Sequence, residues 1–348
     1  MTLPGIESMT PVLPQGRYMG SKASLRDFIW KAVRDLQFDS VLDAFSGTGT
    51  VGYMFKLEGK QVYTNDILAL SYHIANAAIE NTSEILTAED IEMLFRPRRE
   101  YPDFIQRTFQ GLYFTDDENC LLDRVSANIR DLKCEYKRSL ALSAIIRACQ
   151  RKRPRGIFTY TGFDRYVDGR KDLKISLEDQ IRRAAGEFNH AVFDNGQSNK
   201  AYWGDIFDLE APRSDLVYID PPYLSLRSDN DYSRRYHFIE GLARYWDGLE
   251  ILEHTSTKKF AKLPSAFDSK RTIYDAFTRL FEKYKDSILV VSYSNNCLPT
   301  KDEMISLMES VKREVWVENL THRYSFGTHK HKIGNEFNLV SEYLFIGI

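Results

Sequence analysis

The stretch of residues 40–66 constrains the fold of this chain more than any other part of the sequence. An apolar run at residues 40–45 leads into a glycine-rich stretch at residues 47–52, and a second apolar run at residues 61–64 ends at Asn65 and Asp66. Short apolar runs bounded by glycine are typical of buried strands. Because residues 22–36 and 68–79 carry apolar side chains at helical spacing, the pattern predicts a mostly parallel sheet with helices on its faces.

The rest of the sequence divides into a helical stretch and a return of the α/β pattern. Residues 122–132 and 140–146 have helical spacing, whereas residues 215–219 and 287–293 are apolar runs typical of strands. A capping box at Thr300 and Glu303 predicts a helix start, and residues 314–320 and 340–348 predict two more strands. We therefore expect an α/β part at residues 1–82, a mainly helical insertion at residues 83–195, and a second α/β part at residues 196–348.

Composition excludes several classes of protein. The 348 residues include 47 Lys and Arg against 49 Asp and Glu, and this net charge of -2 excludes a uniformly basic nucleic-acid coat. No apolar stretch approaches the roughly 20 residues that span a membrane, and the first residues lack the pattern of a secretory signal. Since the four cysteines show neither a CxxC pair nor metal-ligand spacing, we expect reduced thiols in a cytoplasmic protein.

The glycine-rich stretch predicts a ligand site at the end of the first strand. Gly47, Gly49 and Gly52 match the pattern G-x-G-x-x-G, and Asp66 follows Gly47 by 19 positions. Glycines let the backbone approach a ligand closely, and an acidic side chain at the next strand end can bind ribose hydroxyls. A nicotinamide dinucleotide and S-adenosylmethionine (SAM) both fit this pattern. Asp43 favours SAM, because a carboxylate there repels a pyrophosphate and attracts the cationic methionine end of SAM.

A second motif, Asp220-Pro221-Pro222-Tyr223, follows directly after the predicted strand at residues 215–219. The exocyclic amine of a base is a poor nucleophile because its lone pair is delocalised into the ring. The Asp220 carboxylate and the Pro221 carbonyl can accept hydrogen bonds from that amine and stabilise its developing positive charge. The prolines fix the backbone, and Tyr223 offers a face on which a flipped-out base can stack. The motif therefore favours methyl transfer to a base amine.

Together, these motifs resemble those of the DNA adenine-N6 methyltransferases of the Dam type and of type II restriction-modification systems, a D12-like group with the α order of motifs. The resemblance covers most of residues 17–82 and 202–348. It rests on Arg17-Tyr-Met-Gly-Ser-Lys22, Asp43-Ala-Phe-Ser-Gly-Thr-Gly49, Thr64-Asn-Asp66, Gly204-Asp205-Ile206 and Asp220-Pro-Pro-Tyr223. It implies a Rossmann-like SAM-dependent methyltransferase sheet with an inserted, mainly helical target-recognition domain. In this family Asp at the position of Asp220 is associated with adenine, so the implied activity is N6 methylation of adenine in duplex DNA after base flipping.

The resemblance also implies roles for individual residues. Tyr18 and Lys22 would lie over SAM near its methionine end, and Asp66 would bind its ribose hydroxyls. The remaining residues implied to contact SAM are Asp43, Phe45, Gly47 and Gly49, which would line its pocket, and Asp205 and Ile206, which would contact its adenine. The residues implied to be catalytic are Asp220, Pro221, Pro222 and Tyr223.

A basic and aromatic segment at residues 147–174 is the predicted DNA-facing region. Its nine Lys and Arg against three Asp give a local charge of +6, and such cations bind phosphates while neighbouring side chains contact base edges. The Asn-x-x-Gly-x-Phe-Asn pattern of the Dam type is absent, which leaves the recognition sequence open. The candidate DNA-binding residues are Arg151, Lys152, Arg153, Arg155 and Tyr160 in this segment, and Arg234, Arg235 and Tyr236 after the second motif, where they could cover the flipped base or clamp a phosphate.

Several alternatives remain open on the sequence alone. An RNA adenine-N6 or DNA cytosine-N4 methyltransferase keeps the chemistry and changes the substrate. An NAD-dependent oxidoreductase leaves the second motif unexplained, and a non-catalytic DNA-binding subunit would not require it. His329 and His331 have no nearby carboxylate or thiol, so we expect no metal site. The expected partners are duplex DNA and, within a restriction-modification system, a cognate endonuclease. We expect no membrane contact and a monomer or weak dimer.

Overall fold

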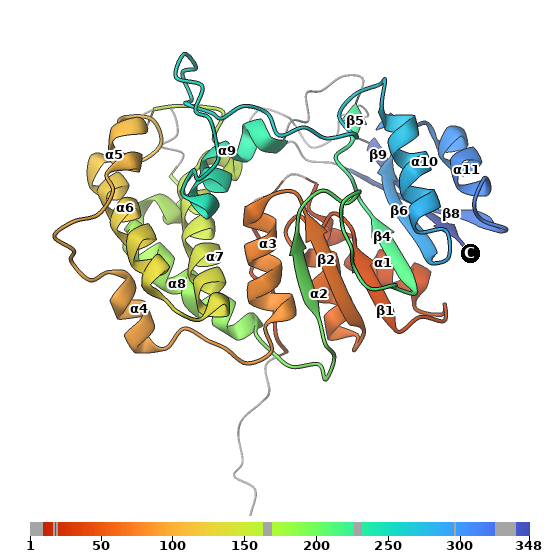
Figure 1. Cartoon of the computed structure of the whole chain (residues 1–348), viewed down its shortest axis with the longest axis horizontal. Coiled ribbons are helices and arrows are strands. Elements are labelled where there is room, and N and C mark those ends of the chain that lie inside the picture. The colour runs from red at the N-terminus through yellow and green to blue at the C-terminus, as the bar shows by residue number, and fades with distance from the viewer. Residues whose placement is uncertain are drawn as a thin grey trace, which may run out of the picture.

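The computed structural model describes residues 10–16, 18, 20–162, 169–225, 232–295, 297–323 and 339–348. Within these ranges a seven-stranded sheet forms the centre of the molecule, in the order β3-β2-β1-β4-β6-β9-β8 (Figure 1). Five neighbouring strands are parallel: β3 (Lys200–Trp203), β2 (Gln61–Asp66), β1 (Ser40–Asp43), β4 (Leu216–Ile219) and β6 (Ile288–Ser294). Strand β9 (Leu339–Gly347) lies antiparallel between β6 and β8 (Val315–Arg323). The short strands β5 (Leu224–Ser225) and β7 (Cys297–Leu298) form a separate antiparallel pair.

Helices cover both faces of the sheet and bury alternate residues of its strands. Leu216 and Tyr218 of β4 pack in one core with α1 (Arg26–Val33), α2 (Thr50–Leu57) and α3 (Ala69–Ala75). Val217 and Ile219 face the opposite core, which contains α10 (Ile273–Lys283) and α11 (Lys301–Glu309). Because strand side chains alternate between faces, a strand buried on both faces reads as one continuous apolar run. The α/β, Rossmann-like fold class expected from the sequence is therefore confirmed.

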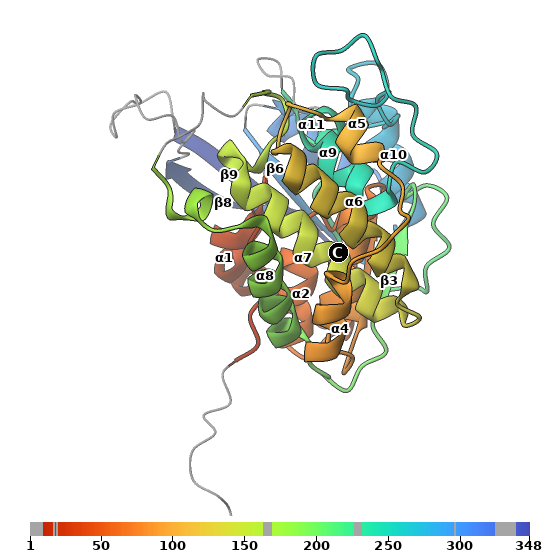
Figure 2. The same cartoon turned by 90° about the vertical axis from the view of Figure 1, so that its left-hand side faces the viewer.

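A layer of helices lies beside α3, away from β6, β8 and β9 (Figure 1). It contains α4 (Ala88–Leu94), α5 (Phe104–Thr108), α6 (Asp116–Asp131), α7 (Glu135–Lys152) and α8 (Leu177–Ala191). Figure 2 views the molecule from this side, with α7 and α8 running alongside one another. Helix α9 (Tyr232–Arg244) follows the second motif in sequence, yet it packs against α7 and α3. The helical layer thus draws on two separate parts of the chain, while the division into parts at residues 82 and 195 stays a prediction.

Two expected helices are interrupted. The helix predicted at residues 22–36 begins as a 3₁₀ turn at Lys22–Ser24 before α1. The helix predicted at residues 68–79 becomes α3 followed by a π-helical turn, Asn76–Glu80. This turn brings the buried Glu80 carboxylate to β3, where it accepts hydrogen bonds from the backbone N–H of Ala201 at 2.9 Å and from Lys200 Nζ at 2.6 Å. Helical spacing alone cannot predict this tertiary contact.

The structure also bears on the cysteines, on groups of metal-ligating residues and on membrane-spanning helices. All four cysteines are free. Among the described residues, no group of His, Cys, Asp and Glu could hold a metal ion, and no helix is long and apolar enough to cross a bilayer. Arg17, the part of the basic segment at residues 163–168, and the pair His329 and His331 lie outside the described residues.

The parallel register determines where the motifs meet. Strands β1, β2, β3 and β4 pair in parallel, so their carboxyl ends lie at one edge of the sheet. The loops that follow them are residues 44–49, 67–68, 204–207 and 220–223, which include both motifs. In a parallel α/β sheet, ligands bind outside this edge.

Candidate active site

The glycine-rich loop after β1 folds tightly against the end of β2. Gly47 and Gly49 have positive φ angles of 51° and 71°, a conformation that residues with a Cβ adopt at a cost. The turn directs the N–H of Gly47 to Asp66 Oδ2 at 2.8 Å. Gly52 lies where α2 approaches the sheet closely, because a Cβ at this position would lie 3.0 Å from Thr64 Cγ2. The three glycines therefore have different structural roles.

Asp43, at the end of β1, is a buried carboxylate with one unsatisfied oxygen. Its Oδ2 accepts a hydrogen bond from the Gly52 N–H at 3.0 Å, while its Oδ1 has no hydrogen-bond partner among the described residues. Burial, with a further contribution from the charge of Asp220, raises the pKa of Asp43 to about 8. A cation bound beside Oδ1 would relieve both the missing hydrogen bond and the cost of ionisation.

Asp66, at the end of β2, accepts a hydrogen bond from a loop backbone N–H at each carboxylate oxygen. Besides the Gly47 N–H, its carboxylate accepts a hydrogen bond from the Leu68 N–H at 2.9 Å through Oδ1. Burial raises the pKa of Asp66 to about 6, although these backbone hydrogen bonds favour its charged form. Asp66 therefore holds the two loops together at the place where the sequence predicted a ribose contact.

The second motif follows β4, and Lys22 binds its carboxylate. Lys22 Nζ lies 2.8 Å from Asp220 Oδ1 and 2.7 Å from Oδ2, and it lies 4.9 Å from the centre of the Tyr223 ring. Burial raises the pKa of Asp220, and the Lys22 ammonium opposes that shift. The Tyr223 ring also packs edge-on against Tyr293, with centroids 4.9 Å apart. The carboxylate of the second motif thus already binds a nitrogen cation, the Lys22 ammonium.

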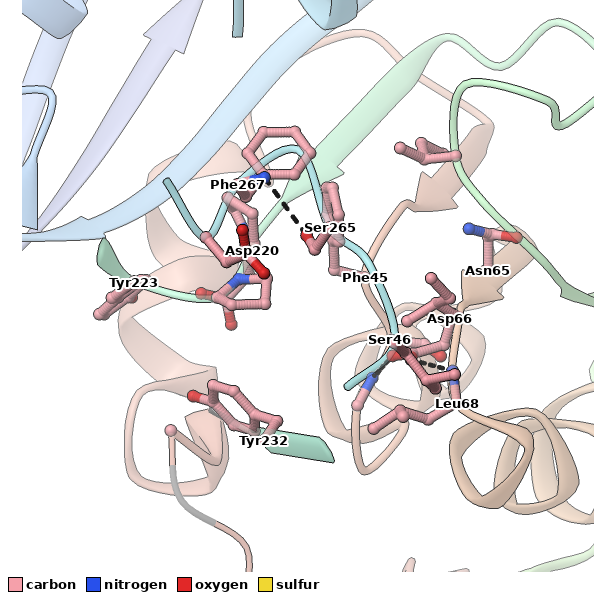
Figure 3. Close-up of a pocket in the computed structure, with 18 of the residues that line it drawn as sticks. Phe45, Ser46, Asn65, Asp66, Leu68, Asp220, Tyr223, Tyr232, Ser265 and Phe267 are labelled. Carbon is pink, nitrogen blue, oxygen red and sulfur yellow. Dashed lines mark hydrogen bonds between the residues drawn. The ribbon is translucent and has the colours of Figure 1, made fainter. Parts of the chain in front are cut away.

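These groups line one cavity of about 240 Å³ at the carboxyl edge of the sheet (Figure 3). All four residues predicted to be catalytic line it, and so does every residue predicted to bind SAM except Gly49. A Cβ at Gly49 would instead lie 3.5 Å from Ile79 Cδ1, so this glycine packs beneath the loop. The cavity therefore brings together residues from the first 66 positions and from residues 204–223.

One wall of the cavity comes from a segment that the sequence analysis missed. Residues 262–268 line the cavity between α9 and α10 in sequence. Phe267 packs edge-on against Phe45 with centroids 5.2 Å apart and stacks on Phe207 at 6.0 Å, and Figure 3 shows Phe45 and Phe267 together on this wall. No spacing or motif marks this segment, because its place depends on the path of the chain after α9.

Helix α9 forms a further side of the site. Tyr236 is fully buried and stacks on Tyr18 at 4.4 Å with ring planes 8° apart, whereas Tyr232 lines the cavity. Glu240, also buried, accepts hydrogen bonds from the N–H groups of Ala69 and Leu70 at the start of α3. Burial raises the pKa of Glu240 to about 7. The segment proposed to cover a flipped base is therefore the first turn of α9, and Tyr236 within it is buried in the interior of the protein.

The candidate DNA-binding residues differ in how far their side chains are exposed. Arg151 Nη2 lies 2.6 Å from Glu187 Oε1, and Lys152 Nζ lies 2.9 Å from Glu118 Oε1. The buried Arg153 donates to the backbone carbonyls of Tyr113, Tyr160 and Gly162. The predicted residues with exposed side chains are Arg155, Tyr160 and, on α9, Arg234, while Arg235 is half-buried.

The sheet order with antiparallel β9, and the cavity at the ends of β1, β2, β3 and β4, define a Rossmann-like methyltransferase. Residues 18–291 match the family model of D12 class N6 adenine-specific DNA methyltransferases. Because that match covers more than half of the chain, the protein belongs to this family and is an adenine-specific DNA methyltransferase. The family resemblance is confirmed, and the oxidoreductase, RNA and cytosine-N4 alternatives are not favoured.

Individual relatives cover most of the chain. The type II methyltransferase M2.HphI of Haemophilus parahaemolyticus is 30% identical over 329 residues, which are 90% of this chain and 93% of that protein. The type II methyltransferase M.NlaIII of Neisseria lactamica is 24% identical and is covered over 98% of its length. The type II methyltransferase M.FokI of Planomicrobium okeanokoites is 28% identical, and this chain spans about half of its length.

Proposed function

We propose that the cavity binds SAM as the methyl donor and that the enzyme methylates an adenine flipped out of duplex DNA. The observation that carries this proposal is Asp43 Oδ1, which has no hydrogen-bond partner within the described part of the chain, on a residue that lines the same cavity as Asp220. Ser46 Oγ and Asn65 Oδ1, on two other residues that line the cavity, also lack hydrogen-bond partners among the described residues. A cationic, polar ligand such as SAM suits these groups, whereas a pyrophosphate would meet the carboxylates of Asp43 and Asp66.

In this proposal different residues along the cavity bind different parts of SAM. Asp43 attracts the cationic methionine end, and Tyr18 lies beside it. Asp66 accepts from ribose hydroxyls, while Asp205 and Ile206 lie at the adenine end. SAM supplies a methyl group that its positively charged sulfur activates for transfer.

The arrangement of Lys22, Asp220 and Tyr223 supports the assignment of the target amine. Lys22 Nζ already binds both oxygens of Asp220 beside the Tyr223 ring, the place where an adenine amine would need an acceptor and a stacking surface. An entering amine displaces Lys22 from at least one oxygen and donates its hydrogens to Asp220 and to the Pro221 carbonyl. Tyr223 stacks on the adenine ring, and positioning of this kind contributes much of the rate.

Charge and atoms balance in the transfer step. SAM bound in the cavity would supply its methyl group to the lone pair of the amine nitrogen, and its sulfur would keep the electron pair of the broken C–S bond. The nitrogen then carries the positive charge that the sulfur has lost. Asp220 stabilises this charge and accepts one of the two amine protons, a role for which its raised pKa suits it.

The proposal also includes the biological role of the enzyme and its partners. The names of the relatives describe type II methyltransferases, and we infer a role in restriction-modification with a cognate endonuclease. The helical layer serves as the target-recognition region, with Arg155, Tyr160, Arg234 and Arg235 toward the DNA. The enzyme acts in the cytoplasm as a monomer or weak dimer.

The test is to identify the methylated base. The purified chain is incubated with SAM and unmodified duplex DNA of mixed sequence, and the DNA is digested to nucleosides for mass spectrometry. We expect N6-methyladenine from the wild type and at least about 100-fold less from Asp220→Ala, with SAM binding retained in a direct titration. N4-methylcytosine as the product, or near-normal methylation by Asp220→Ala, would overturn the proposal.

A further inference from the structure

Glu342, on the last strand of the sheet, contacts the second motif although it belongs to no motif. It lies in β9, where it is paired with Ser294 of β6 and Leu320 of β8. Its side chain is only 7% exposed, and its Oε2 accepts a hydrogen bond from the Tyr223 hydroxyl at 3.1 Å. Glu342 itself does not line the cavity, whereas Tyr223 does. The contact therefore joins residues 119 positions apart at the back of the candidate active site.

Tyr293, Lys22 and Glu342 contact different parts of the Tyr223 side chain. Tyr293 packs edge-on against the ring and limits rotation of its plane. Lys22 lies over one face, bound to Asp220. The hydrogen bond to Glu342 fixes the hydroxyl end and hence the tilt of the whole ring relative to Asp220. Loss of this bond would remove one of the restraints on the end of the ring farthest from the backbone.

Glu342 also acts on Asp220 through its charge. The negative charge of Glu342 contributes to the raised pKa of Asp220, after burial and against the opposing effect of Lys22. A further negative charge near Asp220 favours a positive charge at Asp220 in a poorly solvated site. Such a charge develops on the amine nitrogen during the transfer.

We propose that Glu342 is a positioning residue for methyl transfer: it holds the Tyr223 ring at the angle that a stacked adenine requires, and its charge stabilises the cationic nitrogen. This inference rests on the proposed roles of Asp220 and Tyr223. It adds a residue from β9 to a site that the motifs place only on the carboxyl ends of β1 to β4 and in Lys22.

The experiment compares three substitutions that separate hydrogen bond from charge. Glu342→Ala removes both, Glu342→Gln keeps an acceptor of the same shape without the charge, and Tyr223→Phe keeps the ring without the hydroxyl. Glu318→Gln is the matched control, because Glu318 is an exposed glutamate on the neighbouring strand β8. The kcat is measured with saturating SAM and duplex DNA, and SAM affinity is measured by titration with SAM alone.

We expect Glu342→Ala to lower kcat about 10- to 100-fold and Glu342→Gln to fall between it and the wild type. SAM affinity should stay within about 2-fold, since Glu342 does not touch the cofactor end of the cavity. The double variant Glu342→Ala with Tyr223→Phe should be no slower than the slower single variant. Additive losses, or equal losses of kcat and SAM affinity, would show a general structural role and overturn the inference.

The result is separable from that of the proposed function. If Asp220→Ala is inactive while both Glu342 variants retain full kcat, only the inference about Glu342 fails. If the wild type produces no N6-methyladenine, the proposed function fails first. Because Glu342→Gln preserves volume and an acceptor, it keeps the test informative if Glu342→Ala does not fold.

Discussion

Buried carboxylates at the carboxyl edge of the sheet and cations of the helical layer have different kinds of partner, as four residues show. At the edge, Asp43 and Asp66 are buried and hydrogen-bonded to backbone N–H groups, and burial raises the pKa of both. In the helical layer, Arg151 and Lys152 pair with carboxylates of the same layer. The edge therefore carries an electrostatic cost that a cationic ligand would relieve, whereas the charges of Arg151 and Lys152 are already compensated within the helical layer.

The basic segment at residues 147–174 exposes less positive charge than its sequence suggests. Arg151, Lys152 and Arg153, which were expected to face DNA, have internal partners, and Arg153 is 3% exposed. A local charge of +6 thus overstates the charge that this segment can offer to a phosphate. Partner residues that lie far away in sequence decide which cations reach the surface.

The largest expected effect tests the structural role of Arg153. Replacing it by alanine removes the donor to the buried carbonyl of Tyr113 and to the part-buried carbonyls of Tyr160 and Gly162. We expect Arg153→Ala to lower the free energy of unfolding by about 3 kcal/mol, since hydrogen bonds from buried charged groups are costly to lose. Urea denaturation followed by circular dichroism measures this change. Arg155→Ala is the control, and equal stability of both variants would remove the distinction between buried and exposed arginines.

The second effect tests the unrelieved charge of Asp43. Its native pKa of about 8 lies above the ordinary value of about 3.9, so the folded state binds a proton that the unfolded state has released between these limits. The cofactor-free wild type therefore loses stability as pH rises from about 4 to 8. A neutral asparagine side chain has no such loss, so Asp43→Asn should melt higher than the wild type, with a larger difference at about pH 8 than at about pH 5.

The same substitution should weaken the cofactor site. Removing the negative charge should lower SAM affinity on the order of 10-fold, because an ion pair in a buried site is replaced by a neutral contact. Thermal melts at both pH values and SAM titrations test both effects on one variant. A stability difference that is larger at the lower pH, or undiminished SAM binding, would contradict the assignment of Asp43.

The smallest effect concerns Arg155, an exposed arginine just after α7. Arg155→Ala should leave the melting temperature unchanged and weaken binding of duplex DNA a few-fold, with the slope of log affinity against log salt concentration reduced by about 1. Fluorescence anisotropy over a series of salt concentrations measures both quantities. DNA binding that is unaffected by Arg155→Ala at every salt concentration would assign this surface to something other than phosphate contact.

The residues at the strand ends could be predicted from the sequence, because they directly follow or end the apolar runs that form the strands. An apolar run fixes a buried strand, and the residues that follow it must emerge at the carboxyl edge, as Asp43, Asp66 and Asp220 do. The positive φ angles of Gly47 and Gly49 agree with the tight loop inferred from their spacing. Local geometry was sufficient for these elements.

The missed features depend on neighbours that only the folded chain provides. Phe267 reaches the cavity by packing on Phe45 and Phe207, and Glu342 meets Tyr223 because β9 lies next to β6. Tyr236 was a candidate for DNA contact because it is aromatic and lies beside two arginines, yet it stacks on Tyr18 in the interior. Two final β runs predicted strands correctly, but their order in the sheet does not follow from their sequence.

The position of β9 also bears on when the enzyme becomes active during its synthesis. Every other strand of the sheet precedes β9 in the chain, and the ribosome therefore makes it after them, although it lies between β6 and β8. A nascent chain can form the glycine-rich loop and the second motif well before Glu342 exists. Until β9 inserts, β8 has no neighbour in the sheet and Tyr223 lacks its hydrogen bond to Glu342. Completion of the active site is in this way tied to completion of the sheet.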